Sequence, residues 1–176
     1  MRRALIVLVA AVVTSLATAQ KAIVLSLEQS GADEIVENLW NNTTAPHSNG
    51  ITADESLNEK CELENTTQTD LYIYKADPAI ATGQAVVVVP GGGYRKICIK
   101  YDGFEVAKYL RSIGITAVLV KYRLPNGHYE VPLEDAQRAM HYTRTEGAKW
   151  GVDPAQVGIL GSSAGGSVGN SVTASV

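Results

Sequence analysis

The sequence predicts an α/β protein with a mostly parallel sheet and helices on both faces. Apolar runs of strand length alternate along the chain with segments whose apolar residues recur at helical spacing. Glycine and proline clusters separate one segment from the next. This alternation is typical of a parallel sheet, because each connecting helix returns the chain to the edge from which the previous strand started.

Strand patterns occur at four places. Residues 69–75 alternate aliphatic and tyrosine side chains, which predicts a strand with one half-solvated face. Residues 85–89 are a continuous run typical of a strand buried on both faces, and residues 116–122 predict the next buried strand. Residues 156–160 predict a further buried strand that leads directly into a glycine-rich motif.

Two helices are predicted between these strands. The first covers residues 103–112 with one apolar face, and Gly114 is well placed to end it. The second begins at Pro132, because proline fits the first turn of a helix. Glu134 and Asp135 follow in that turn, where carboxylates favour the positive end of the helix dipole.

The chain divides into three predicted parts. Residues 1–19 resemble a secretory signal peptide, since two arginines precede an apolar run that ends in the small-residue site Ala17–Ala19. A retained N-terminal anchor is the alternative. Residues 20–65 are polar and predicted to be irregular, whereas residues 66–176 carry the pattern of a folded domain. The export signal predicts a secreted or periplasmic protein.

The net charge and the cysteine content limit the classes of partner and site that the sequence predicts. The net charge is −3 with acids and bases interspersed, which predicts no nucleic-acid partner, and no membrane contact once the signal is removed. Cys61 and Cys98 are too few for a disulfide framework and lack metal-ligand spacing. We therefore expect two independent thiols rather than a disulfide between Cys61 and Cys98.

The most informative motif is Gly161-Ser162-Ser163-Ala164-Gly165, which follows the last predicted strand. Gly-x-Ser-x-Gly between a strand and a helix forms a nucleophile elbow, a tight turn that holds the serine in a strained conformation. The flanking glycines let strand and helix approach closely. The motif predicts Ser163 as a nucleophile and the Ala164 N–H as a donor to a developing oxyanion.

A second glycine motif, Pro90-Gly91-Gly92-Gly93, follows the first buried parallel strand. It should lie at the same edge of the sheet as Ser163, because the carboxyl ends of parallel strands meet there. A triple glycine alone is most often a flexible turn. Together with a downstream Gly-x-Ser-x-Gly, its uncovered backbone N–H groups favour an acyl-transfer site.

Four motifs resemble those of α/β-hydrolase esterases: Pro90–Tyr94, Lys121–Pro125, Glu134–Ala139 and Gly161–Gly166. The resemblance covers about residue 37 to the end and is strongest to secreted bacterial carbohydrate esterases of the acetyl-xylan and feruloyl esterase type, some labelled xylanase-like. It implies the α/β-hydrolase fold, with Ser163 as nucleophile and Gly92, Gly93 and Ala164 around the oxyanion.

The resemblance also implies a histidine and an acidic residue on later strands, which this sequence does not contain. We therefore expect residues 66–176 to be the N-terminal part of a hydrolase domain, truncated after the nucleophile elbow. The sequence departs from related patterns at two places. Pro90 stands where hormone-sensitive-lipase relatives have histidine, and Gly166-Ser167-Val168 replaces a frequent Gly-Gly-His-Leu continuation.

The remaining candidate residues are Tyr94 and the histidines. Tyr94 is predicted to form a wall of the substrate cleft, and His128 to lie in a substrate loop at the catalytic edge, since that loop follows a parallel strand. His47 falls in the irregular segment and His141 on the surface of the second helix. Asp135 is expected to cap its helix or pair with Arg123 rather than take part in catalysis.

The predicted function is a serine hydrolase that cleaves carboxylic esters through an acyl-enzyme on Ser163. The resemblance implies acetyl or feruloyl groups on plant polysaccharide, so the partner is a small-molecule or polysaccharide ester. No metal or organic cofactor is expected. Without a base, Ser163 alone should be nearly inert. The open alternatives are a peptidase or arylformamidase of the same fold, and a non-catalytic α/β-hydrolase-like binding protein.

Overall fold

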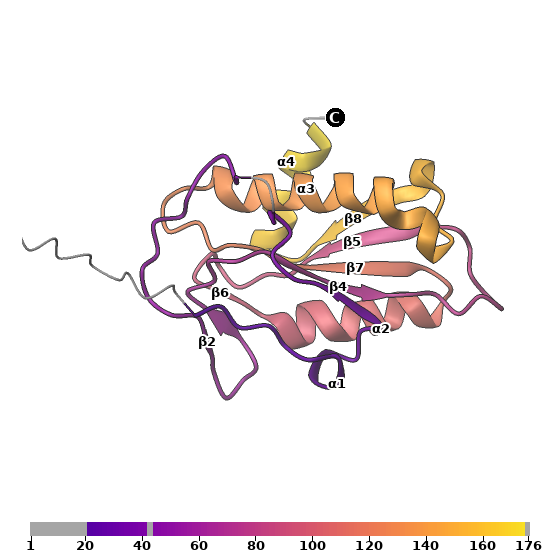
Figure 1. Ribbon diagram of the computed structural model, residues 1–176, viewed down its shortest axis with the longest axis horizontal. Helices are drawn as coiled ribbons and strands as arrows, with labels where there is room; N and C mark the ends of the chain where they lie inside the picture. Colours follow the sequence, from indigo (N-terminus) through magenta and orange to yellow (C-terminus); the bar gives the residue numbers. More distant parts are fainter. Residues whose placement is uncertain (1–20, 42–43, 175–176) are drawn as a thin grey trace, which may run out of the picture.

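The computed structural model describes residues 21–41 and 44–174. The predicted signal peptide, residues 1–19, lies outside the described residues. A central sheet lies between α2 on one face and α3 with α4 on the other (Figure 1). In chain order, the helices and strands are α1 (Leu27–Ser30), β1 (Glu34–Val36), β2 (Ser56–Leu57), β3 (Leu63–Glu64), β4 (Asp70–Tyr74), β5 (Ala85–Val89), β6 (Lys96–Ile97), α2 (Glu105–Ser112), β7 (Thr116–Lys121), α3 (Glu130–Glu146), β8 (Val157–Gly161) and α4 (Ala164–Ala174).

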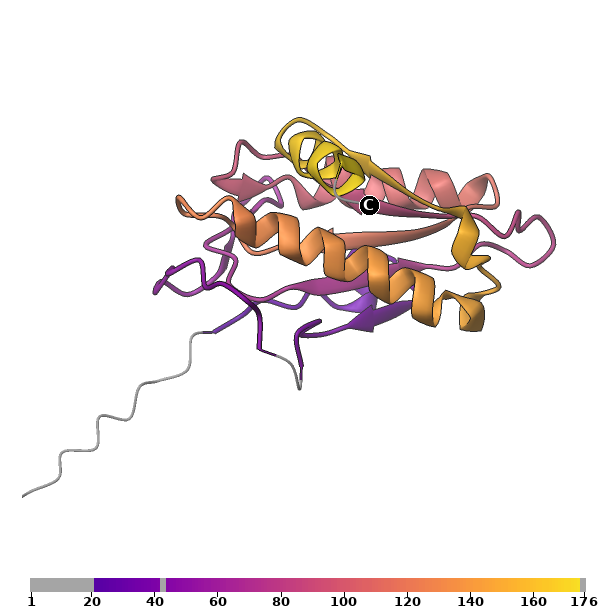
Figure 2. The ribbon, with the colours of Figure 1, turned by 90° about the horizontal axis from the view of Figure 1, so that it is seen from above.

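The main sheet of the described residues has the strand order β1-β4-β7-β5-β8. β5 pairs in parallel with both β7 and β8, while β4 and β1 extend the sheet in antiparallel pairing. Figure 2 shows α3 lying along the sheet with α4 beside it. The predicted α/β architecture is confirmed, and the carboxyl ends of β5, β7 and β8 meet at one edge.

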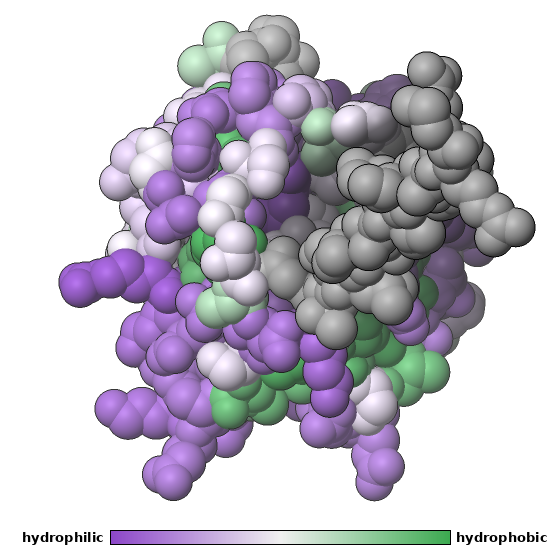
Figure 3. All heavy atoms as spheres, turned by 60° about the vertical axis from the view of Figure 1, so that its left-hand side comes forward, coloured by the Kyte–Doolittle hydropathy of each residue, from purple (hydrophilic) through white to green (hydrophobic). Residues whose placement is uncertain are grey.

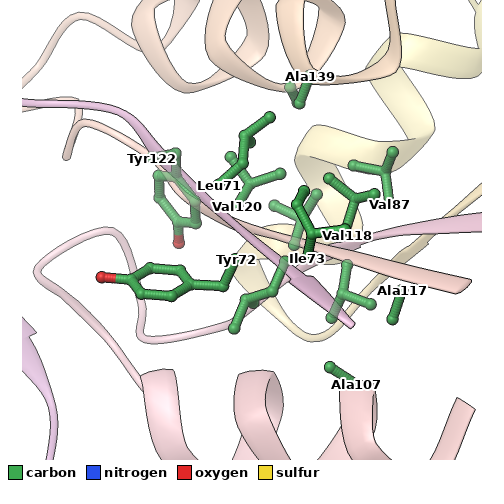
Figure 4. Close-up of a cluster of buried hydrophobic side chains, with 14 of the residues drawn as sticks. Leu71, Tyr72, Ile73, Val87, Ala107, Ala117, Val118, Val120, Tyr122 and Ala139 are labelled. Carbon is green, nitrogen blue, oxygen red and sulfur yellow. The ribbon is translucent and has the colours of Figure 1, made fainter. Parts of the chain in front are cut away.

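The core lies on both faces of the central strands. Val87 and Val118 are fully buried, as expected of strands covered on both sides. In Figure 4, side chains of β4, β5 and β7 fill the space between α2, which contributes Ala107, and α3, which contributes Ala139. The two alanines keep the helix surfaces flat, so the larger side chains of the sheet pack directly against them.

β4 is fully buried, and the predicted half-solvated face is wrong. Tyr72 accepts a hydrogen bond from the Leu25 N–H at 2.9 Å, and Tyr74 donates to the Ser30 carbonyl at 2.8 Å. Burial raises the pKa of both tyrosines. A tyrosine has an apolar ring and a polar tip, so its sequence pattern is the same whether the tip reaches water or a buried backbone group.

The segment expected to be irregular, residues 20–65, carries short strands. β1 forms an edge of the main sheet, and β2 and β3 join β6 in a small antiparallel sheet. Strands of two or three residues are too short to leave an alternating pattern. The helix starts also differ: a π-helical segment, Ile99–Phe104, precedes α2, and α3 begins at Glu130 rather than Pro132.

β8 is less buried than the sequence predicts. Val157 is buried, but Leu160 is 39% exposed. Among the described residues β8 pairs only with β5, so it forms the other edge of the sheet. The apolar pattern that predicted a buried strand therefore belongs, among the described residues, to an edge strand.

A buried ion cluster joins β7 to the N-terminal segment. The Lys121 Nζ atom lies 2.7 Å from a carboxylate oxygen of both Glu55 and Asp70, and all three side chains are fully buried. Lys121 also donates to the Ile23 carbonyl, while Glu55 accepts the Thr67 N–H. These contacts fix residues distant in sequence against the end of β7.

We expect Lys121→Met to lower the free energy of unfolding by about 3–5 kcal/mol, because two carboxylates would remain buried without their cation. Lys108→Met is the control, since its 3.3 Å pair with Glu105 is exposed and its loss should cost at most about 1 kcal/mol. Urea unfolding followed by circular dichroism measures both changes. Similar small losses in the two variants would contradict a structural role for the cluster.

Candidate active site

The turn between β8 and α4 has the geometry of a nucleophile elbow. Ser163 has a φ of +50°, in the left-handed region that non-glycine residues rarely occupy. Its side chain is exposed at the carboxyl edge of the sheet. Strain of this kind persists only where the surrounding structure enforces it.

Two close approaches enforce the strained turn. A Cβ atom on Gly161 would overlap the carbonyl oxygen of Gly165, and one on Gly165 would overlap the carbonyl oxygen of Val89. Backbone atoms cannot move aside as the end of a flexible side chain can. The two glycines therefore fulfil the steric role that the motif predicts.

Gly165→Ala should destabilise the fold by about 3 kcal/mol, because the added methyl group would push α4 away from the end of β5. Gly158→Ala, on the same strand, is the matched control: a Cβ there meets nothing within 4 Å, so its effect should be within about 0.5 kcal/mol. Thermal unfolding compares the two. Equal stability of both variants would refute the close approach.

The structure brings the glycine loop against the elbow. A Cβ on Gly91 would lie 2.9 Å from the Ser162 carbonyl oxygen and 3.1 Å from the Ser163 Cβ. β5 and β8 pair in register up to Val89 and Gly161, so both loops leave the sheet at the same level. The predicted meeting of the two motifs at one sheet edge is confirmed.

The glycine loop directs its carbonyl groups inward. The Pro90 carbonyl accepts the buried Tyr122 hydroxyl at 2.9 Å, the Gly91 carbonyl accepts the Cys98 N–H at 2.9 Å, and the Gly92 carbonyl accepts two N–H groups at 3.3 Å. The N–H groups of Gly92 and Gly93 have no hydrogen-bond acceptor among the described residues. They are the uncovered donors that an oxyanion site requires.

Ala164 supplies a third N–H group at the first position of α4, where no carbonyl of the helix can accept it. No acidic residue lies in the first turn of α4, so the positive end of the helix dipole is not neutralised. The dipole of α4 therefore favours a negative charge beside Ser163.

Asp102 is a site residue that the sequence analysis missed. Its carboxylate accepts the Gly91 N–H at 3.2 Å from the π-helical segment before α2. Asp102 and the Tyr122 hydroxyl thus bind opposite sides of one peptide group, the bond between Pro90 and Gly91. Only the unusual helical turn aims this carboxylate at the glycine loop, and no sequence pattern predicts that turn.

Tyr94 directly follows the glycine loop and lines a pocket, and its role as a wall of the substrate cleft stays a prediction. Its φ is +61°, and its ring packs edge-to-face on Tyr129 with the centroids 5.2 Å apart. His128 lies in the expected loop, but it is about half exposed and its ion-pair partner is Glu130 at 3.4 Å. No described contact joins His128 to Ser163, so its role in substrate binding stays a prediction.

The other titratable candidates lie away from the elbow. His47 pairs with Glu134, whose hydrogen bond raises the pKa of the imidazole, and His141 is exposed as expected. Asp135 is buried and binds Arg123 with an Nη2–Oδ1 distance of 2.7 Å, which confirms the expected pair.

Cys61 and Cys98 are free thiols, as favoured by the sequence, and burial raises the pKa of Cys98. Within residues 21–41 and 44–174, no group of three or more His, Cys, Asp or Glu side chains could hold a metal ion. The same ranges contain no helix long and apolar enough to span a membrane.

The site combines a strained serine at a strand-to-helix turn with a glycine loop at the carboxyl edge of a parallel sheet. This combination places the chain in the class of proteins with a nucleophile elbow. Comparison with known families agrees. The chain matches the α/β-hydrolase fold family over residues 86–176, about half of its length, and belongs to that family.

Individual relatives are esterases or xylan-degrading enzymes by name. The chain is 37% identical over 89 residues to an acetylxylan esterase of Xylanibacter ruminicola, and 31% identical over 84 residues to endo-1,4-beta-xylanase B of Butyrivibrio fibrisolvens. A solved structure, an acetyl ester-xyloside bifunctional hydrolase from Caldicellulosiruptor lactoaceticus, superposes with a TM-score of 0.55 at 30% identity. The resemblance to α/β-hydrolase esterases is confirmed.

The chain spans only part of each relative. The two sequence matches cover 51% and 46% of this chain but 18% and 13% of the respective proteins. The structural match covers 77% of this chain and 44% of the hydrolase. The family match over residues 86–176 contains the elbow and the glycine loop.

Proposed function

We propose that the protein hydrolyses carboxylic esters through an acyl-enzyme on Ser163. The observation that carries the proposal is an exposed, strained serine that packs against Gly91, beside the Ala164 N–H and next to the loop that carries the uncovered N–H groups of Gly92 and Gly93. Attack of the Ser163 Oγ on an ester carbonyl places negative charge on the carbonyl oxygen, and these donors stabilise that charge. Each donor is worth on the order of 10²–10³ in rate.

The proposed substrates are acyl esters of plant polysaccharide, with acetyl preferred. Acetyl groups are supported by the names of an esterase relative and of a structural relative, both of which specify acetyl esters. Feruloyl esters rest on the sequence resemblance alone and are the second acyl group that we propose.

The mechanism needs a base to accept the Ser163 proton and an acid to orient that base. Among the described residues, no side chain is hydrogen-bonded to the Ser163 Oγ, and His47 and His128 are paired with Glu134 and Glu130. The proposal therefore assigns the base and the acid to residues outside those described. The described part supplies the nucleophile and the oxyanion donors.

In the full-length protein, Ser163→Ala should lower kcat for 4-nitrophenyl acetate on the order of 10⁶-fold, because the only proposed nucleophile is lost. The hydroxyl is exposed, so the fold should be unchanged. Ser162→Ala is the matched control, since Ser162 lies outside the left-handed region, and it should retain most of the activity.

Four outcomes, from these variants or from the unmodified protein, would redirect the assignment. Full activity of Ser163→Ala would disprove the acyl-enzyme, and equal loss in both variants would indicate damage to the turn. Cleavage of amides in place of esters would favour a peptidase or arylformamidase. Ligand binding without turnover in the unmodified protein would favour a binding protein.

We also propose that the protein is exported, to the periplasm or outside the cell. Cleavage after Ala19 should yield exported material whose first residue is Gln20, because Ala17 and Ala19 occupy the small-residue positions of a signal-peptidase site. N-terminal sequencing measures the start. Membrane-bound material that begins at Met1 would instead support the retained anchor.

A further inference from the structure

A pocket of about 420 Å³ opens beside the glycine loop. It is lined by Asn65, Tyr94, Arg95 and Asn126, together with residues 50–53 and Leu124. The loops that line it gather on the side of the molecule that Figure 3 brings forward, where most of the visible described residues are hydrophilic. The catalytic machinery proposed above uses none of these polar side chains.

The pocket is close to the reacting atoms. Gly91 packs on Ser163, and Tyr94 follows three residues later, so the backbone between them spans at most about 10 Å. A group held in the pocket is therefore within the length of a small substrate from the Ser163 hydroxyl.

Backbone strain is concentrated at this pocket. Six described non-glycine residues have a positive φ, and Asn65, Tyr94 and Asn126 are three of them, at +55°, +61° and +47°. A fourth is the nucleophile itself, Ser163. Asparagine tolerates this conformation, but tyrosine rarely adopts it. Such strain clusters at ligand sites, where side chains must be aimed precisely at the ligand.

The polar groups of the pocket form a mixed set of donors and acceptors. The Asn126 amide nitrogen donates to the Asn49 carbonyl at 2.9 Å, and the Asn65 amide nitrogen donates to the Asp54 carbonyl at 3.4 Å. Neither Oδ1 atom receives a hydrogen bond from a described residue. The Arg95 guanidinium has no ion pair or hydrogen bond within the described part of the chain.

Hydroxyl groups match this set, because each can donate to an amide oxygen and accept from a guanidinium. An exposed aromatic pair adds an apolar surface, since Tyr129 is 61% exposed and packs on Tyr94. A sugar ring carries hydroxyls at its rim and C–H groups on its faces, so it satisfies both features. An unsubstituted aromatic alcohol would leave the polar groups unpaired.

We propose that this pocket binds the alcohol half of the ester, as a sugar residue held by Asn65, Asn126 and Arg95 beside the tyrosine pair. The inference rests on the proposed esterase function and deepens it, because it assigns recognition of the polysaccharide to named residues. The acyl group then lies toward Gly92 and Gly93, and the sugar toward residues 50–53.

The test compares two acetyl esters that differ only in the alcohol: a mono-acetylated xylo-oligosaccharide and 4-nitrophenyl acetate. The variants are Asn65→Gly and Asn126→Gly, because glycine removes the amide and keeps the left-handed backbone free of strain. Each should raise KM for the sugar ester about tenfold, with kcat unchanged, because one hydrogen bond made equally in the ground and transition states is lost. KM for 4-nitrophenyl acetate should change by less than about twofold.

Asn170→Ala is the control, an exposed amide on α4 that does not line the pocket, and it should leave both esters unaffected. Parallel loss on both esters, or no loss on either, would overturn the inference.

Titration with unesterified xylobiose separates this inference from the proposed function. Binding to the full-length protein that Asn65→Gly and Asn126→Gly weaken about tenfold would support the pocket, even if no ester were hydrolysed. Absence of xylobiose binding to an active esterase would refute the pocket and leave the esterase function intact.

Discussion

The close approach of Gly165 to the end of β5 is the constraint on which the candidate site depends. Because no Cβ fits between Gly165 and the Val89 carbonyl oxygen, α4 starts directly against the strand that leads into the glycine loop. This contact places Ser163 on Gly91 and brings the Ala164 N–H to the side on which Gly92 and Gly93 have uncovered donors. A side chain at this position would separate Ser163 from the N–H groups that we propose as oxyanion donors.

A second constraint acts through β7, which contributes no proposed catalytic atom. Lys121 at its end holds Glu55 in the core, and Arg123, two residues later, donates to the His47 carbonyl at 2.6 Å while it binds Asp135. Both cations therefore anchor the N-terminal segment over the carboxyl edge of the sheet. Residues 50–53, which line the proposed sugar pocket, lie between these two anchors. Buried charge in the fold thus positions the surface that we assign to substrate recognition.

The sequence predicts those parts of the structure that depend on local sterics. Gly-x-Ser-x-Gly can be recognised because the turn itself requires Gly161 and Gly165, whatever surrounds it. The burial of β4, the short strands of residues 20–65 and the Gly91–Asp102 hydrogen bond depend on contacts between distant segments. No periodic pattern encodes such contacts. The sequence analysis did not predict the pocket for the same reason, since only the fold brings Asn65 and Asn126 to the walls of one pocket.

The family match covers the elbow and only part of the proposed pocket. Residues 86–176, which match the α/β-hydrolase family, contain Ser163, the glycine loop and one side of the pocket. Asn65 and residues 50–53, the other side, lie outside that range. Membership of the family therefore accounts for the elbow, whereas in our proposal the choice of the alcohol depends in part on a segment that the match does not include. On the same proposal, variation in that segment would change substrate preference without disturbing Gly165, because its anchors, Lys121 at the end of β7 and Arg123 just after it, are separate from the elbow that follows β8.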